Sequence, residues 1–283
     1  MPCFPGADGR RLYFADSGAP GSGGGLAVLC LAGLSRNHRD FEALAAHLAR
    51  RHRVIRLDSR GRGLSERAID PAVEYSIAVE TGDALALIAH LGLSRLAIVG
   101  TSRGGILGMG IAAARPDLVA ALVLNDVGAV IARAGLMRIA DYLGVAPPPD
   151  FEAAAAALRL ANAESFPGIP PDAWLRFARQ IYDDRDGRPV LSYDPALRDT
   201  VQAALAATEG DVSLWQLFEA LSACPMLVLR GANSDILCAE TVAQMAQRRP
   251  GLTHVEIADR GHAPFLDEAV ALMAIDRVLA AAS

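Results

Sequence analysis

Short apolar runs and helical patterns alternate along residues 26–126, and this alternation constrains the fold more than any other feature. Four runs have the length of a strand: Leu26–Leu31, Val54–Leu57, Leu96–Val99 and Leu118–Leu124. The helical patterns between them span Asp40–Arg50, Ile77–Leu91 and Gly105–Ala114. Continuous apolar strands joined by helices are typical of a parallel sheet with both faces covered.

The alternation stops after Asp126 and returns at Met226. Residues 128–222 show no convincing strand and favour helices broken by Pro and Gly: Ile131–Leu143, Phe151–Ala163, Asp172–Tyr182, Pro195–Ala207 and Val212–Leu221. The later pattern is Met226–Leu229, Glu240–Arg248, Thr253–Ile257 and Leu266–Ala281. We therefore predict an α/β core of residues 1–127 and 223–283, interrupted by an all-helical cap of residues 128–222 that is too long for a simple loop.

Charge and composition exclude several classes of protein. The chain has 27 basic and 32 acidic residues, a net charge of −5, which argues against a nucleic-acid partner. All the basic residues are Arg, so a lysine nucleophile, a pyridoxal Schiff base and a P-loop lysine are excluded. No cluster of Cys and His suggests a metal, and we expect no metal and no organic cofactor.

Nothing in the sequence resembles a signal peptide or a membrane span. The first residues carry neither a basic region nor an apolar stretch, and no run of about 18 apolar residues occurs. The four cysteines form no C-x-x-C pair. We expect a reduced, cytoplasmic protein without a membrane span, and the sequence leaves open whether it forms a homo-oligomer.

The sequence Gly100-Thr-Ser102-Arg-Gly104 follows one apolar run directly and precedes a helical pattern. A serine between two glycines at such a tight strand-to-helix turn is held in a strained conformation with its hydroxyl exposed. The amino end of the following helix favours developing negative charge. Ser102 is therefore the candidate nucleophile.

A serine hydroxyl needs a general base, and that base needs an orienting carboxylate. His262 lies in a loop after the strand Thr253–Ile257, which opens at the same sheet edge as Ser102. Asp235 follows the strand Met226–Leu229 at that edge and is the favoured acid. Asp126, after the strand Leu118–Leu124, is the alternative acid.

Two backbone N–H groups are expected to form an oxyanion hole. Arg103 follows the nucleophile, and Leu34 lies in the loop after Leu26–Leu31, where Gly33 lets the backbone come close.

Substrate-binding candidates flank this predicted site or lie in the cap. Arg36 and Arg103 could clamp a substrate carboxylate. Aromatic residues of the cap could wall an apolar pocket or form the core of the cap instead. The full set of substrate-binding candidates is Arg36, His38, Trp174 and Trp215, with Phe177 and Phe218 as further cap aromatics.

These motifs together resemble the α/β-hydrolase superfamily over nearly the whole chain. The resemblance rests on Asp8-Gly9-Arg10, Asp58–Ser65, Gly100–Gly104, Arg230–Asp235 and Gly261-His262. It implies an eight-stranded, mostly parallel sheet, a helical cap, no organic cofactor and a Ser-His-Asp mechanism with the chain order Ser102, Asp235, His262. The chain departs from the family at Ala32, where His is usual, and at Arg103, where an apolar residue is common.

The sequence thus predicts a serine hydrolase of a small-molecule carboxylic ester or lactone, acting through an acyl-enzyme. Within the superfamily it is most similar to bacterial esterases and lactone hydrolases, including the enol-lactonase branch. Two alternatives remain: a hydrolase of C–C bonds in meta-cleavage-type diketo acids, and a ligand receptor on a hydrolase scaffold.

Overall fold

The computed structural model of the chain describes residues 2–18 and 25–282. Its central strands are β1 (Cys3–Pro5), β2 (Arg11–Ser17), β3 (Ala27–Leu31), β4 (Val54–Leu57), β5 (Leu96–Thr101), β6 (Val119–Asn125), β11 (Met226–Gly231) and β12 (Thr253–Ile257). They form one eight-stranded sheet in the order β1-β2-β4-β3-β5-β6-β11-β12. β2 pairs antiparallel with β1 and β4, and the other neighbours run parallel. The predicted mostly parallel α/β sheet is confirmed.

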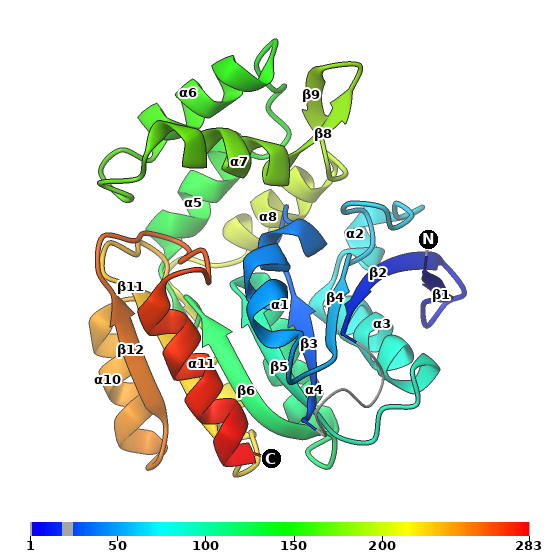
Figure 1. Cartoon of the computed structure of the whole chain (residues 1–283), viewed down its shortest axis with the longest axis vertical. Helices are drawn as coiled ribbons and strands as arrows, with labels where there is room; N and C mark the ends of the chain where they lie inside the picture. The colour runs from blue at the N-terminus through cyan, green and yellow to red at the C-terminus, as the bar shows by residue number, and fades with distance from the viewer. Residues whose placement is uncertain (1, 19–24, 283) are drawn as a thin grey trace.

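Helices cover both faces of this sheet (Figure 1). The helical segments of the core are η1 (His38–Phe41), α1 (Glu42–Leu48), α2 (Pro71–Glu74), α3 (Ile77–His90), α4 (Arg103–Ala114), α10 (Ala239–Arg248) and α11 (Ala269–Ala282). Successive strand residues point to opposite faces. In β5, Leu96 and Ile98 belong to the apolar cluster that includes α3 and α4, whereas Ala97 and Val99 belong to the cluster that includes α1 and α11.

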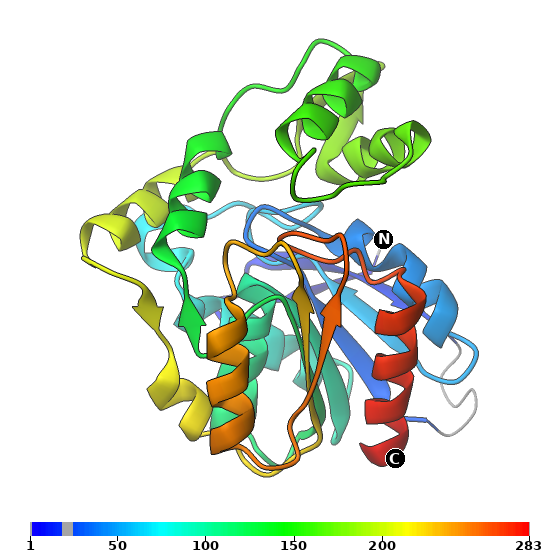
Figure 2. The same ribbon diagram turned by 90° about the vertical axis from the view of Figure 1, so that its left-hand side faces the viewer.

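A long insert separates β6 from β11. Its elements are β7 (Val130–Ile131), α5 (Arg133–Tyr142), α6 (Phe151–Ala161), α7 (Pro171–Ile181), β8 (Tyr182–Arg185), β9 (Arg188–Leu191), α8 (Leu197–Ala206), β10 (Val212–Ser213) and α9 (Trp215–Glu219). From α5 to α8 they lie beyond the carboxyl end of the parallel strands (Figures 1 and 2). The division into a core of residues 1–127 and 223–283 and a cap of residues 128–222 stays a prediction, and residues 1, 19–24 and 283 lie outside the described residues.

The insert differs from the all-helical prediction because it contains strands. β8 and β9 form an antiparallel hairpin joined by Asp186 and Gly187. Both turn residues have positive φ, 54° and 80°. Asp-Gly is a favoured sequence for such a two-residue hairpin turn, so the sequence carries a local signal for this hairpin. β10 likewise pairs with β7 at the start of the segment predicted as one helix over Val212–Leu221.

Residues 192–194, just after this hairpin, pair with the loop that follows β4. The Gly63 N–H donates to the Ser192 carbonyl at 2.7 Å, and the Asp194 N–H donates to the Gly61 carbonyl at 2.7 Å. The Tyr75 hydroxyl adds a bond of 2.6 Å to the Asp194 carboxylate. The insert is therefore hydrogen-bonded to the core through both backbone and side chains.

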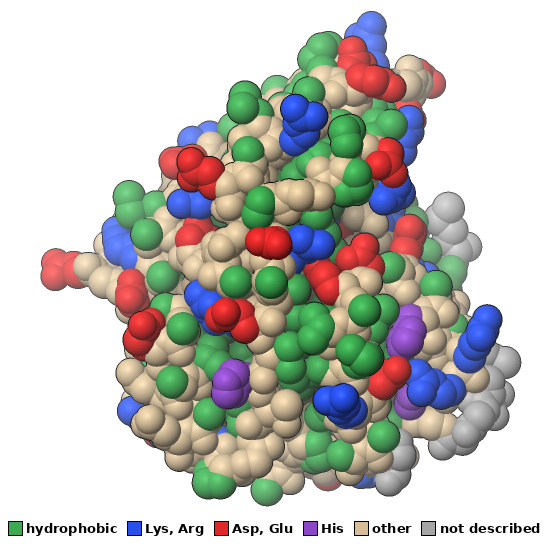
Figure 3. Space-filling view, turned by 60° about the vertical axis from the view of Figure 1, so that its left-hand side comes forward, with side chains coloured by type: hydrophobic (Ala, Val, Ile, Leu, Met, Phe, Trp, Pro, Cys, Tyr) green, Lys and Arg blue, Asp and Glu red, His purple; other side chains and the backbone are tan. Residues whose placement is uncertain are grey.

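Acidic and basic side chains are interspersed over the cap and the core on the face shown in Figure 3. Many arginines pair with carboxylates, as Arg53 does with Asp16 at 2.7 Å. Within residues 2–18 and 25–282, no helix is both long and apolar enough to cross a membrane.

Candidate active site

Ser102 occupies the single position between the end of β5 and the start of α4. Its backbone has φ 51° and ψ −120°, a left-handed conformation that costs energy for a residue with a Cβ atom. Its N–H donates to the Asn125 carbonyl at 2.9 Å, which fixes the turn against the end of β6. The tight turn predicted from the sequence is therefore present.

Close backbone contacts explain the two glycines around Ser102. A Cβ atom on Gly100 would collide with the backbone of Gly104, and one on Gly104 would collide with the carbonyl of Leu31 at the end of β3. Neither obstacle is the movable end of a side chain. Both positions therefore require glycine for the turn to form.

The imidazole of His262 lies between the serine and a carboxylate. Its Nε2 is 2.9 Å from Ser102 Oγ, and its Nδ1 is 2.7 Å from Asp126 Oδ2. An imidazole with its proton on Nδ1 donates to Asp126 and accepts the serine proton at Nε2. The arrangement can therefore activate the Ser102 hydroxyl for attack on an electrophilic carbon.

Asp126 is fully buried and follows β6 directly. One oxygen accepts the Gly231 N–H at 2.8 Å, and the other accepts the Ser234 hydroxyl at 2.6 Å in addition to the His262 ring. Such bonds satisfy the lone pairs of a buried carboxylate and hold its orientation.

The prediction that Asp235 orients the histidine is wrong in this structure. Asp235 instead pairs with Arg138 of α5 at 3.2 Å, and the alternative, Asp126, contacts His262. β6 and β11 are neighbouring parallel strands, so the residues after both strands reach the same edge. The sequence could not rank them, because the choice depends on which side chain turns toward the ring.

Two polar residues near the histidine were not predicted from the sequence. Ser234 donates to Asp126 and stands one position before the predicted acid. The buried Asn125 donates to Thr101 Oγ1 at 3.1 Å and to the Pro264 carbonyl at 3.0 Å, linking the end of β5 to the loop that carries His262. A polar residue ending the apolar run of β6 was the available signal for Asn125.

The backbone around Ser102 also fits the predicted oxyanion donors. A Cβ atom on Gly33 would lie 3.8 Å from the Ser102 Cβ, so the loop with Leu34 passes beside the serine. Arg103 begins α4, whose amino end carries partial positive charge. Within the described part of the chain, neither the Leu34 nor the Arg103 N–H has an intramolecular hydrogen-bond partner.

The predicted polar substrate contacts already have other partners. Arg36 binds Asp40 through two hydrogen bonds of 2.6 and 2.7 Å, and its guanidinium lies 4.7 Å from the centre of the Phe177 ring. His38 Nδ1 is 2.9 Å from a carboxylate oxygen of Asp58. The structure thus gives these side chains roles in holding the loop after β3 and does not assign them to a substrate.

The two cap tryptophans are packing residues. Trp174 is 2% exposed and lies edge-on to Phe166 in a small apolar cluster of the insert. Trp215 packs against Phe218, with the Arg248 guanidinium 3.9 Å from its ring centre. The sequence allowed two possible roles for them, lining a pocket or packing the cap. The structure shows packing.

The insert packs on the two loops that bear the site. Phe265, three residues after His262, stacks on Phe166 at 5.1 Å between ring centroids. Asn233, in the loop that reaches Asp126, donates to the Ser165 carbonyl at 3.2 Å. The positions of both loops therefore depend on contacts with the insert.

Comparison with known proteins gives this site a family. A family model described as the alpha/beta hydrolase fold matches residues 27–269. The chain belongs to the alpha/beta hydrolase fold family. The predicted resemblance and fold class are therefore confirmed, and the chain is a hydrolase.

The names of similar proteins give different substrates. It is 37% identical over 279 residues to a 3-hydroxybutyrate-oligomer hydrolase of Cupriavidus necator, covering 95% of this chain and 93% of that one. It is 29% identical to a 2-(acetamidomethylene)succinate hydrolase of Mesorhizobium japonicum, over 85% of this chain and 82% of that one. Among solved structures, an alpha/beta hydrolase from Novosphingobium aromaticivorans has a TM-score of 0.90 at 41% identity, covering 99% and 97% of the two chains.

No metal site accompanies these residues in the part of the chain that the structure describes. There, no three side chains among His, Cys, Asp and Glu are grouped so that they could hold a metal ion.

Proposed function

We propose that the protein is a serine hydrolase that cleaves carboxylic esters through Ser102, His262 and Asp126. The observation that carries the proposal is the pair of contacts made by one imidazole, 2.9 Å to the Ser102 hydroxyl and 2.7 Å to the Asp126 carboxylate. A hydroxyl, a base and an orienting acid in this order form the minimum set for nucleophilic acyl transfer.

In the first half of the reaction, Ser102 Oγ attacks the ester carbonyl while His262 Nε2 takes the hydroxyl proton. The carbonyl oxygen becomes an oxyanion, and the Leu34 and Arg103 N–H groups stabilise it. The tetrahedral intermediate then collapses with cleavage of the ester C–O bond. His262 gives its proton to the leaving alkoxide, so an alcohol departs and the acyl group stays on Ser102.

In the second half, His262 removes a proton from a water molecule that attacks the acyl-enzyme. The same two N–H groups stabilise the second oxyanion. Collapse breaks the bond to Ser102 Oγ, which regains its proton from His262, and the carboxylic acid is released. Asp126 remains ionised throughout and stabilises the imidazolium that forms in each half.

Short oligoesters of hydroxy acids are the substrate class that we propose. The relative from Cupriavidus necator, whose name gives 3-hydroxybutyrate oligomers as its substrate, matches nearly the full length of this chain. An oligoester bond is a carboxylic ester, and a lactone is its cyclic form, so the same chemistry serves both. Among the described residues, no contact in the site favours cleavage of a C–C bond, or binding of a ligand without turnover, over cleavage of an ester.

A substrate panel with the purified full chain tests this function. We expect turnover of 3-hydroxybutyrate dimers and trimers and of butyrate aryl esters, with no turnover of a meta-cleavage diketo acid. A fluorophosphonate probe should label Ser102, as peptide mass spectrometry would show. Turnover confined to the diketo acid would replace the ester proposal. Labelling without turnover of any panel member would favour the receptor alternative.

A further inference from the structure

Two arginines and one carboxylate form a buried cluster behind Ser102. Glu80 of α3 is 1% exposed and accepts from Arg62 at 2.8 Å. The same carboxylate accepts from Arg103 Nε at 2.9 Å and from Arg103 Nη2 at 3.0 Å. Arg62 is also 1% exposed, whereas the Arg103 side chain is 17% exposed. One carboxylate therefore holds two guanidinium groups, one from the loop after β4 and one from the first residue of α4.

Each arginine is attached to one half of the proposed oxyanion hole. Arg62 Nε donates to the carbonyl of Leu34 at 2.7 Å. This bond fixes the peptide group between Leu34 and Ser35, next to the one that carries the Leu34 N–H. Arg103 is itself the second donor residue, and its Nη2 donates to the Tyr75 carbonyl at 2.6 Å. Both donor residues are therefore linked to Glu80, Leu34 through Arg62 and Arg103 through its own side chain.

The charge of the cluster also suits an oxyanion. Burial works to raise the pKa of Glu80, but the guanidinium groups of Arg62 and Arg103 outweigh it and the pKa is lowered, so Glu80 is ionised at neutral pH. Burial lowers the pKa of Arg62 as well, but an arginine stays charged at neutral pH, so the two guanidinium groups and one carboxylate leave a net positive charge beside the loop and the helix start that carry the donors. Fixed positive charge near a developing oxyanion stabilises it without reorganisation.

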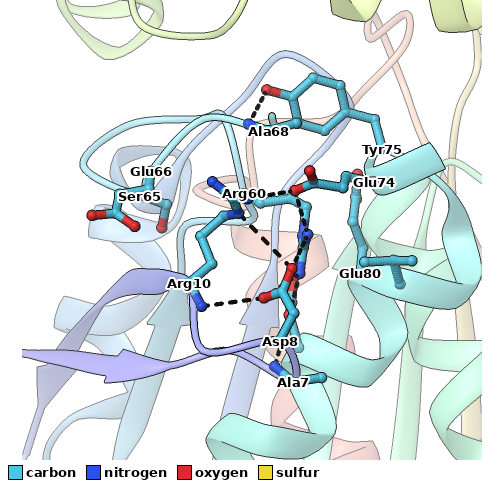
Figure 4. A network of polar contacts seen from close by, with 12 residues as sticks. Ala7, Asp8, Arg10, Arg60, Ser65, Glu66, Ala68, Glu74, Tyr75 and Glu80 are labelled. Carbon is cyan, nitrogen blue, oxygen red and sulfur yellow. Dashed lines mark hydrogen bonds and ion pairs between the residues drawn. The ribbon is translucent and has the colours of Figure 1, made fainter. Parts of the chain in front are cut away.

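A neighbouring ion-pair network, centred on Arg60, serves as a comparison for the role of Glu80. Arg60 is buried among Asp83, Asp8 and Glu74, with contacts of 2.7, 3.0 and 2.9 Å. Figure 4 shows Arg60 with Asp8 and Glu74. Asp83 lies one turn after Glu80 on α3 and is equally buried, but its side-chain hydrogen bonds go to Arg60 and to the Ala7 N–H instead of to Arg62 and Arg103. Loss of either carboxylate removes a buried ion pair, whereas only Glu80 reaches the oxyanion donors.

We propose that Glu80 is a positioning residue that couples the two halves of the oxyanion hole through Arg62 and Arg103. The inference rests on the proposed function, because the oxyanion hole is part of it. Removing one donor from such a hole costs about 100- to 1000-fold in kcat, and misplacing both by a fraction of an ångström costs less.

The test compares Glu80→Gln with Asp83→Asn in the full chain. Active sites are first counted by fluorophosphonate labelling carried to completion, and kcat is expressed per labelled site. We expect Glu80→Gln to lower kcat per site by roughly 10- to 100-fold with little change in KM. Its affinity for a boronic acid inhibitor should fall in parallel. Asp83→Asn should lower the labelled fraction or the thermal midpoint, with kcat per site within about threefold of wild type.

Arg103→Met keeps the test decisive if Glu80→Gln fails to fold. This variant removes the Arg103 guanidinium group from the cluster. The side chain is partly exposed, so the fold should tolerate its loss. We expect kcat per site to fall at least about tenfold, with partial recovery in Arg103→Lys, which restores the charge. Wild-type kcat per site in Arg103→Met, or equal kcat per site in Glu80→Gln and Asp83→Asn, would overturn the coupling role.

Failure of this inference differs from failure of the proposed function. If the wild-type protein neither labels at Ser102 nor cleaves esters, the proposed function fails. If the wild-type protein does both and Glu80→Gln retains full kcat per labelled site, only the role of Glu80 fails.

Discussion

Asp126 is the residue whose surroundings say most about the proposed chemistry. Its carboxylate receives a backbone N–H, a hydroxyl and an imidazole N–H, from Gly231, Ser234 and His262. A buried carboxylate that accepts this many hydrogen bonds is held in one orientation. It can therefore fix the tautomer of the histidine and stabilise the imidazolium during acyl transfer.

Replacing each of the two candidate acids tests this assignment. Asp126→Asn should lower kcat/KM for a butyrate ester by about 1000- to 10000-fold, because the amide favours the wrong tautomer of His262. Asp235→Asn, the matched control, should stay within about threefold of wild type, because it removes only a surface pair with Arg138. The reverse pattern of losses would restore Asp235 as the acid.

The identity of the acid is the part of the site that the sequence did not predict. Ser102 and His262 were predictable, because a Gly-flanked serine after an apolar run and a loop histidine after the last strand have few alternative roles. Asp126 and Asp235 follow adjacent parallel strands, so strand order alone puts both at the right edge. The decision came from tertiary contacts with Gly231 and Ser234, which no local pattern encodes.

Among the elements, the contact between the insert and the loop after β4 joins the two parts of the molecule. Asn37 adds to it, since its side chain donates to the Ser192 hydroxyl at 3.1 Å and to the Gln180 carbonyl at 3.2 Å. Asn37 lies in the loop that carries Leu34. The segment after the β8–β9 hairpin is thereby bonded to the same loop as the proposed oxyanion donor.

Tyr75→Phe probes this attachment. It removes the hydroxyl bond to Asp194 and should lower the free energy of unfolding by about 1 to 2 kcal/mol. Hydrogen exchange at the Asp194 amide, which bonds the Gly61 carbonyl, should speed up.

Tyr193→Phe is the control for that prediction. The Tyr193 hydroxyl accepts the Gly144 N–H at 3.0 Å, a bond within the insert. Its loss should speed exchange at Gly144 and leave Asp194 protected. Unchanged exchange at Asp194 in Tyr75→Phe would show that the hydroxyl bond does not hold the attachment.

The ion-pair network around Arg60 ties α2 to the loop after β1 and predicts a pH dependence of stability. Partial burial works to raise the pKa of Glu74, but N–H bonds from Ile69 and Asp70 and the charges of Arg10 and Arg60 outweigh it and lower the pKa. A carboxyl group with a lowered folded-state pKa stabilises the fold above its unfolded value, near 4.3 for Glu, and this contribution is lost as pH falls through the folded value.

Urea unfolding of Glu74→Gln at pH 6, 4 and 3 measures this contribution. The variant should unfold at lower urea than wild type at pH 6, and the difference should shrink as pH falls toward 3. Glu209→Gln, an exposed loop substitution, should follow the wild-type curve. A constant difference between Glu74→Gln and wild type at all three pH values would contradict the ionic origin.

The strands and helices were predicted correctly from the sequence where burial requires a continuous apolar run. β3, β5, β6 and β11 are almost entirely buried, so their sequences are nearly continuous apolar runs. The exposed hairpin β8–β9 has no such run, since Tyr182–Arg185 is polar and half exposed. Its formation depends on the turn at Asp186 and Gly187 and on packing of the insert.

At the scale of the whole molecule, the sheet positions the site residues and the insert packs on neighbouring loops. The serine, the acid and the histidine follow β5, β6 and β12 at one edge, and the insert packs on the loop that carries His262 and on the loop after β11 that contacts Asp126. The proposed catalytic unit therefore depends on the fold bringing together residues that are 160 positions apart.

Hydrolysis by Ser102→Ala tests the central claim most directly. The rates of this variant with a 3-hydroxybutyrate dimer and with a butyrate ester are compared with the rates of wild type and of a control variant, Ser94→Ala. Ser94 is an exposed serine just before β5. We predict a loss of at least about 1000-fold in kcat for Ser102→Ala and a wild-type rate for Ser94→Ala. A folded Ser102→Ala protein that still cleaves these esters at the wild-type rate would contradict the account.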